Sequence, residues 1–459
     1  MSAVKSALLS LAFATGAFAH IGSPDVFFQG KAGPYPLLVV IRPPSAIPGT
    51  AGIEVRALDP GITRVELTPT PMVGEASKHP PVADVAEQSK TDPQYFTGTL
   101  WLMTSGSWEV HVKATGPAGT FELPVPISAM ATKTQPMQRG VEVFLIGMLL
   151  FLGAGMVAIV GATVRESKLA PGAPSPPWNR RSVFWMAFTA ALLCVAVWAG
   201  NAWWASDAAL SARNIYKPFV ISASLENSNR MNLRLTDPGW LVSRSLDNIV
   251  PDHGHFMHFF LIRWPNMDEF FHLHPDPAAA GLYNLTLPTL PAGHYRIYGD
   301  IVHDSGFAET AVGETDLPNI TGAPLEGDDA GGRMPGDPAI VWLHDPTQPI
   351  RAKQVNAFRF ELNGPDGPED LEPYMGMGGH AEFVKLDGTV FAHVHPTGTV
   401  PMAAVTVASP AAMMAMHQME IGKVVSFPYG LPEPGRYKIF VQLRKGTVRT
   451  AAFDLTVVP

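Results

Sequence analysis

Cysteine is almost absent from this 459-residue sequence, whose single Cys194 lies in an apolar run. One cysteine excludes an internal disulfide framework and a thiolate metal cluster. Charge is also sparse: charged residues make up 16%, the formal net charge is -8, and the parts expected to be soluble have no basic cluster. A chain with this charge and no basic cluster is not expected to bind nucleic acid. Any soft metal ligand must come from the 19 methionines.

Turn-forming residues are abundant, with 42 glycines and 44 prolines, which indicates several small β-rich units. Short alternating segments follow one another between such turns in the first part of the chain, at 38–41, 53–56, 64–67, 95–103, 108–114 and 120–126. This density of short strands is typical of an immunoglobulin-like β-sandwich, which we expect over residues 20–128.

The N-terminus has the pattern of a secretory signal peptide over residues 1–19. Lys5 supplies the charged region, an apolar stretch follows, and Ala17-Phe18-Ala19 matches a cleavage site. The mature chain would then begin at His20, whose α-amino and ring nitrogens can together chelate copper. The alternative is that His20 is merely the residue after the cut.

Two apolar runs, 141–164 and 182–205, are long enough to cross a bilayer as helices. The loop 165–181 between them carries four basic residues, so the positive-inside rule places it in the cytoplasm. We therefore expect a transmembrane hairpin in a bacterial inner membrane, with the lipid bilayer as a partner and both terminal domains in the periplasm. Neither run has an ionisable residue at its centre, which favours an anchor over an ion pathway.

A histidine pattern occurs twice after the second run. His258 precedes His272-Leu273-His274-Pro275 by 14 positions, and His380 precedes His393-Val394-His395-Pro396 by 13. Strand residues i and i+2 share a face, and a hairpin brings the preceding strand alongside. Each copy thus predicts three converging imidazoles, a set that suits copper, with zinc as the alternative metal. The other interpretation is that hydrogen-bonded histidines pin a hairpin.

Further candidate ligands lie near each copy. The first copy adds His253, His255 and His303. The second copy has an insertion with a methionine-rich run, in which Met416 and Met419 are candidate ligands because thioether sulfur favours Cu(I). The alternative for these methionines is apolar packing against the sheet.

The two copies define two more domains, at 216–325 and 339–459, joined by an acidic, glycine-rich linker at 326–338. Each domain ends in a glycine turn followed by an aromatic and alternating residues, as in Gly293-His294-Tyr295 and Gly435-Arg436-Tyr437, which predicts a closing hairpin. The predicted fold is mainly β, with three immunoglobulin-like β-sandwich domains and a two-helix transmembrane hairpin.

With a signal ending before a histidine, glycine-aromatic closing hairpins and clustered His and Met, the chain resembles periplasmic copper-handling modules of the CopC and YtkA-like kind. The resemblance covers fold pattern and composition, and it implies copper binding without catalysis, with an envelope or copper-handling protein as partner. The rival hypothesis is an envelope adhesion or assembly module with structural histidines. An enzyme with a three-histidine metal site would need a general base, and the spacing of Asp252, Asp268, Glu269 and Asp300 singles out none of them.

Overall fold

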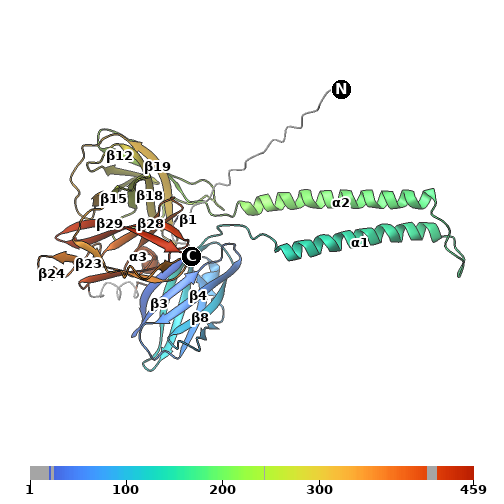
Figure 1. The fold of residues 1–459 in the computed structure, drawn as a ribbon, viewed down its shortest axis with the longest axis horizontal. Helices are drawn as coiled ribbons and strands as arrows, with labels where there is room; N and C mark the ends of the chain where they lie inside the picture. The colour runs from blue at the N-terminus through green and yellow to red at the C-terminus, as the bar shows by residue number, and fades with distance from the viewer. Residues whose placement is uncertain (1–19, 22–24, 242, 411–420) are drawn as a thin grey trace. The chain divides into compact units, whose positions relative to one another are not determined.

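The computed structural model describes residues 20–21, 25–241, 243–410 and 421–459, and its fold is mainly β (Figure 1). The chain divides into two units. Met1–Met130 and Lys217–Pro459 form the β unit, and Ala131–Tyr216 form a helical unit. The prediction of a mainly β chain interrupted by two helices is confirmed.

The helical unit consists of α1 (Arg139–Glu166) and α2 (Arg180–Ala212). Each helix contains one of the two predicted apolar runs and is longer than that run at both ends. A capping box starts α2: the Asn179 side chain accepts a hydrogen bond from the Ser182 backbone N–H, and the Ser182 hydroxyl bonds back to Asn179. With 28 and 33 residues, both helices are long and apolar enough to cross a membrane.

The first β region contains two sheets around one apolar core. All six segments expected as strands are strands, and the structure adds β2 before them. The five-stranded sheet has the order β2 (Val26–Ala32), β3 (Tyr35–Arg42), β4 (Gly49–Ala57), β8 (Tyr95–Leu102) and β7 (Glu87–Gln88). The four-stranded sheet has the order β10 (Gly119–Ala129), β9 (Gly106–Gly116), β5 (Arg64–Pro71) and β6 (Asp84–Val85).

The second β region, which carries the first histidine copy, forms one connected ten-stranded sheet. A single parallel bridge between Val220 and Val312 joins its halves. Part of the expected linker 326–338 belongs to this sheet, because Ala330–Arg333 pair with the strand that carries His272. The strands are β11 (Val220–Leu225), β12 (Arg230–Thr236), β13 (Ile249–Val250), β14 (His258–Arg263), β15 (Glu269–Leu273), β16 (Asp276–Ala279), β17 (Leu282–Thr286), β18 (Gly293–His303), β19 (Ala308–Leu317) and β20 (Ala330–Arg333).

The third β region, with the second copy, has a six-stranded and a four-stranded sheet. The expected closing hairpins are present: β18 pairs with β19, and β28 with β29. The larger sheet has the order β1 (His20–Ile21), β26 (Val390–Val394), β25 (His380–Lys385), β28 (Gly435–Lys445), β29 (Thr447–Val458) and β22 (Ile350–Arg351). The smaller contains β21 (Ile340–Trp342), β23 (Asn356–Gly364), β24 (Gly367–Pro368) and β27 (Val424–Tyr429), and one helix is α3 (Met402–Ala408).

The two histidine-bearing regions pack against each other through an apolar cluster. Strand β14 is buried on both faces: Phe259 belongs to the core of its own region, whereas Phe260 lies in the cluster shared with the third region. Ring stacking across this boundary is reciprocal. Phe270 on β15 of the first copy stacks on Phe440 in the closing hairpin of the second copy, with ring centroids 4.3 Å apart. In the same way, Phe391 on β26 of the second copy stacks on Tyr298 in the closing hairpin of the first copy, at 4.1 Å. The same surface of each copy therefore forms the interface, as in an isologous dimer.

Candidate metal centre

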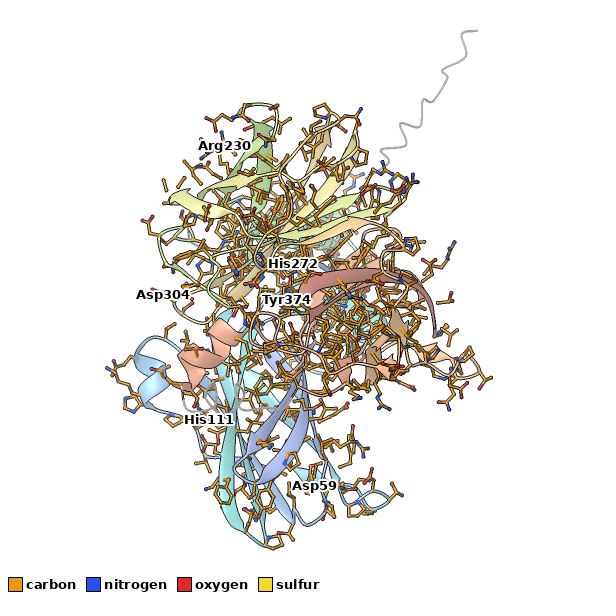
Figure 2. The ribbon with its side chains drawn as sticks, turned by 90° about the vertical axis from the view of Figure 1, so that its left-hand side faces the viewer. Asp59, His111, Arg230, His272, Asp304 and Tyr374 are labelled. Atoms are coloured by element: carbon orange, nitrogen blue, oxygen red, sulfur yellow. The ribbon has the colours of Figure 1, made fainter. Side chains whose placement is uncertain are left out.

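Eight histidines form one continuous cluster where the two copies meet. Neighbouring ring centroids lie between 3.9 and 6.5 Å apart. His272 and the adjacent Tyr374 mark the place in Figure 2. The members are His253, His255, His258 and His272, with His274, His380, His393 and His395. The sequence predicted two separate groups, one in each domain, and the structure brings them together.

The pairing of strands explains how each copy assembles its histidines. In the first copy β14 pairs with β15, with Phe260 opposite His272, so His258 lies beside the end of β15, where His274 follows. In the second copy β25 pairs with β26 in the same way, with Glu382 opposite His393. Alternation along each strand then directs His258 and His272 to the face that meets the other copy.

The first group is the one that the sequence predicted. His258, His272 and His274 each offer a ring nitrogen, and these nitrogens all lie within 4.8 Å of one another. His258 Nδ1 and His272 Nε2 are 3.0 Å apart and form a hydrogen bond in the absence of an ion. Nitrogens that bind one ion at about 2 Å lie roughly 3 Å apart, so this spacing fits a shared metal.

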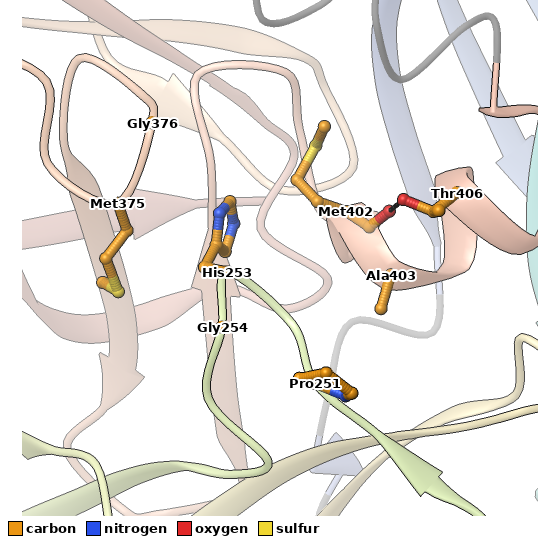
Figure 3. A pocket seen from close by; sticks show the side chains of 8 residues that line it. All are labelled: Pro251, His253, Gly254, Met375, Gly376, Met402, Ala403 and Thr406. Carbon is orange, nitrogen blue, oxygen red and sulfur yellow. Dashed lines mark hydrogen bonds between the residues drawn. The ribbon is translucent and has the colours of Figure 1, made fainter.

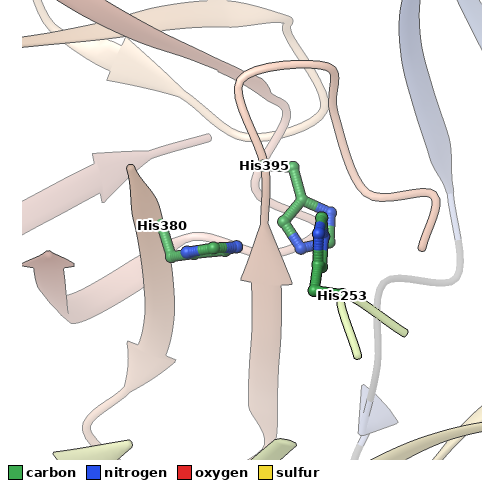
Figure 4. A group of neighbouring side chains, drawn as sticks. All are labelled: His253, His380 and His395. Carbon is green, nitrogen blue, oxygen red and sulfur yellow. The ribbon is translucent and has the colours of Figure 1, made fainter. Parts of the chain in front are cut away.

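The second group differs from its predicted composition. Its three rings are His380 and His395 from the second copy and His253 from the first, again with nitrogens within 4.8 Å of one another (Figure 4). His393, which was predicted as the third ligand, lies beside them with its ring centroid 4.6 Å from that of His395. The second group is therefore complete only when both copies are in contact.

A tight turn places His253 across the boundary. Asp252 and His255 exchange two backbone hydrogen bonds, and the two residues between them, His253 and Gly254, have φ of 52° and 90°. Positive φ at both central residues is the signature of a type I′ turn. Met375 and Gly376 form the same turn in the second copy, with φ of 50° and 80°.

Hydrogen bonds to the outer ring nitrogens orient several of these imidazoles. Asp329 accepts from His274 Nδ1 at 2.9 Å, the Gln442 side-chain oxygen accepts from His272 Nδ1 at 3.1 Å, and Asp300 accepts from His393 Nδ1 at 3.2 Å. Metal-binding histidines usually have such a partner on the nitrogen that faces away from the ion.

Sequence reasoning missed Asp329 and Gln442, and it considered Asp300 only as a general base. Asp329 lies in the segment predicted as a linker. Asp300 and Gln442 occupy matching places in the two closing hairpins, each two residues after the stacked aromatic, so the repeat carried a signal that could have identified them.

Several buried ring nitrogens in the cluster have no hydrogen-bond partner among the described residues. They are Nε2 of His258, His274, His393 and His395 and both ring nitrogens of His380. Leaving one buried polar group unpaired costs about 1–3 kcal/mol. Coordination to a metal ion would offset this cost, and hydrogen bonding within the protein does not.

Burial also sets the charge state of the rings. Desolvation holds the pKa well below 6.5 for four of them, namely His258, His272, His380 and His395. The pKa of His274 is lowered for the same reason. For His393 burial acts in the same direction, but the hydrogen bond and charge of Asp300 outweigh it and raise the pKa. Neutral imidazole is the form that binds metals.

Five carboxyl groups surround the rings. Two of them are Asp300 and Asp329, described above. The other three are Asp328, Asp252 and Glu382, whose carboxyl oxygens lie 3.2–3.9 Å from a ring nitrogen of His255, His258 and His272, respectively. Glu382 is fully buried, and burial raises its pKa to about 8. The region thus places five carboxyl groups around the rings, and burial favours the protonated form of one of them, Glu382.

The remaining predicted ligands lie outside the cluster or outside the described residues. His303 was expected to assist the first group, but its two ring nitrogens bond to Asn248 and Glu309, both at 2.8 Å, so that expectation is corrected. The backbone of His20 pairs with Val390 in β26. Met416 and Met419 belong to 411–420, outside the described residues.

Comparison with known proteins gives one family match: residues 338–459 match a domain of unknown function, DUF8832. No curated protein matches. Similar solved structures include Salmonella alpha-2-macroglobulin reacted with methylamine (10% identity, TM-score 0.21, 95% of this chain and 24% of that one). Another is latent PorU from Porphyromonas gingivalis (11% identity, TM-score 0.15, 95% of this chain and 34% of that one). A third is a bacterial ice-binding adhesin (7% identity, TM-score 0.15, 90% of this chain and 91% of that one). The chain spans about a quarter and a third of the first two, and TM-scores this low carry no functional argument.

Proposed function

We propose that this chain is a membrane-anchored metal-binding protein that holds copper between its two histidine-bearing β regions. The observation that carries the proposal is the convergence of imidazoles in two groups of three. In these groups His258, His274, His380 and His395 are largely buried, and each has a ring nitrogen with no hydrogen-bond partner among the described residues. A structural role for these histidines would leave those nitrogens uncompensated in a buried site.

The donor set favours copper over magnesium or calcium, because imidazole suits copper and zinc whereas the harder ions prefer oxygen. Two thioethers add to the argument. Met375 and Met402 line a pocket of about 450 Å³ together with His253 (Figure 3). Thioether sulfur is a soft donor that selects Cu(I), so the pocket suits entry or exit of reduced copper.

The proposed location is supported by the helices and by the N-terminal sequence pattern. Two helices that can cross a membrane, a basic loop between them and a cleavable signal support anchoring in a bacterial inner membrane, with the β regions in the periplasm. Within this proposal the β regions are three modules of the immunoglobulin-like, CopC and YtkA-like kind, and the protein buffers copper or passes it to an envelope partner.

Copper uptake by the full chain in detergent tests the proposal. Metal-free protein should take up copper in a fixed ratio to protein at micromolar concentration, and a His272→Ala, His274→Ala double variant should lose at least part of it. His294→Ala is the matched control, since that exposed imidazole bonds to Asp316 outside the cluster. If the wild type binds no copper, or the double variant binds as much as the control, the histidines are structural and the adhesion or assembly role gains support.

A further inference from the structure

The cluster contains more imidazoles than one ion can use. Copper and zinc in proteins take about four ligands, and eight histidine rings lie in contact here. Six of the eight rings form two groups of three, each with its own set of converging nitrogens. Each group supplies three of the roughly four ligands that one ion takes.

The two groups are not separate sites. The ring of His258 in the first group lies 5.9 Å from that of His253 and 6.5 Å from that of His380, both in the second group. Ions held by these nitrogens would be separated by little more than one imidazole ring. The rings of the two groups contact each other directly.

His393 occupies the space between the groups. Its ring centroid is 5.4 Å from that of His258 and 5.3 Å from that of His380, and its Nε2 has no hydrogen-bond partner among the described residues. Asp300 holds the other nitrogen, which fixes the ring in this place. His393 is therefore available as an additional ligand on the side where the groups meet.

Acidic groups near the rings bear on how much positive charge the cluster can hold. Two divalent ions in a buried chamber repel each other and need compensation. Carboxyl groups around the rings can provide part of it. Three of them lie beside histidines of the first group, and the other two lie beside His255 and His393.

We propose that the cluster holds two copper ions as one two-ion centre, with the first ion on His258, His272 and His274 and the second on His253, His380 and His395. This inference rests on the proposed copper binding. It adds that the second ion is held by both copies together, so the centre exists only in the assembled interface.

Metal analysis combined with electron paramagnetic resonance of the full chain in detergent, loaded with Cu(II), tests the inference. Two copper ions per chain are expected, with a spectrum broadened by magnetic interaction between them and a half-field transition. Removing one ligand from either group should leave one ion per chain and the sharp spectrum of an isolated Cu(II). The variants are His274→Ala for the first group and His253→Asn for the second, because asparagine tolerates the left-handed backbone at that turn. His294→Ala should behave as the wild type.

The outcomes separate this inference from the proposed function. One copper per chain with an isolated spectrum in the wild type would overturn the two-ion centre and leave copper binding intact. Two ions with independent, sharp spectra would also overturn it, because the groups would then be distant sites. No copper at all would overturn both.

Discussion

Replacing Glu382 by glutamine is expected to stabilise the metal-free protein at alkaline pH. The Glu382 side chain is fully buried, and burial raises the pKa of its carboxyl group from 4.5 to about 8. The Gln442 amide donates a hydrogen bond to one of its oxygens at 2.6 Å. A glutamine has the same shape and can accept the same hydrogen bond, but it never has to ionise in the buried site.

The size of the effect follows from linkage between protonation and folding. The pKa of this group is higher in the folded chain than the ordinary value of 4.5, so its contribution to stability is full below pH 4.5 and is lost as the pH rises towards about 8. The whole loss corresponds to about 5 kcal/mol, since each pKa unit is worth roughly 1.4 kcal/mol. Glutamine removes this loss.

Thermal unfolding of metal-free wild type and Glu382→Gln, followed by circular dichroism, measures the effect. The variant should unfold at a higher temperature than the wild type at about pH 9, and the difference should shrink towards about pH 5. Glu309→Gln is the contrasting control: its carboxylate is buried against Arg244 and His303, so breaking that pair should lower stability by about 3–5 kcal/mol. The reasoning is refuted if Glu382→Gln unfolds below the wild type at about pH 9.

Three further predictions follow from the same geometry. Asp329→Asn should weaken copper binding by about 10–100-fold with little change in unfolding temperature, because Asp329 orients His274, and competition with a coloured chelator measures it. Phe391→Ala should cost about 3–5 kcal/mol in thermal unfolding, because its buried ring stacks on Tyr298 across the interface; an unchanged melting temperature would argue against this packing. Metal-free protein should lose stability as the pH falls below about 6.5, because four histidines of the cluster become protonated in the unfolded chain but stay neutral when buried in the folded chain. Melting temperatures that stay level down to about pH 5 would contradict this. The rings concerned are His258, His272, His380 and His395.

Much of the local structure could be predicted because it depends on short-range periodicity. Alternation gave the strands and the shared face of His272 and His274, and the repeat gave the matching hairpins. The first group of three imidazoles follows from these two features alone. The helices were predictable for a different reason, namely the length and apolar composition of the two runs.

The meeting of the two copies could not be predicted in this way. It depends on the far face of β14 and β25, where Phe260 and Val384 pack between regions, and local alternation does not say which partner covers a second apolar face. The crossing of His253 into the second group follows from that docking. Asp329 was missed for a related reason: an acidic, glycine-rich segment has the composition of a linker, yet its glycines pair in the sheet beside β15.

The most direct test of the central claim is the position of the metal itself. Crystals of the copper-loaded chain, measured at the copper absorption edge, should give an anomalous peak about 2 Å from the inward nitrogens of His258, His272 and His274. Copper found only at exposed histidines such as His79 or His294, with none in the cluster, would contradict the account.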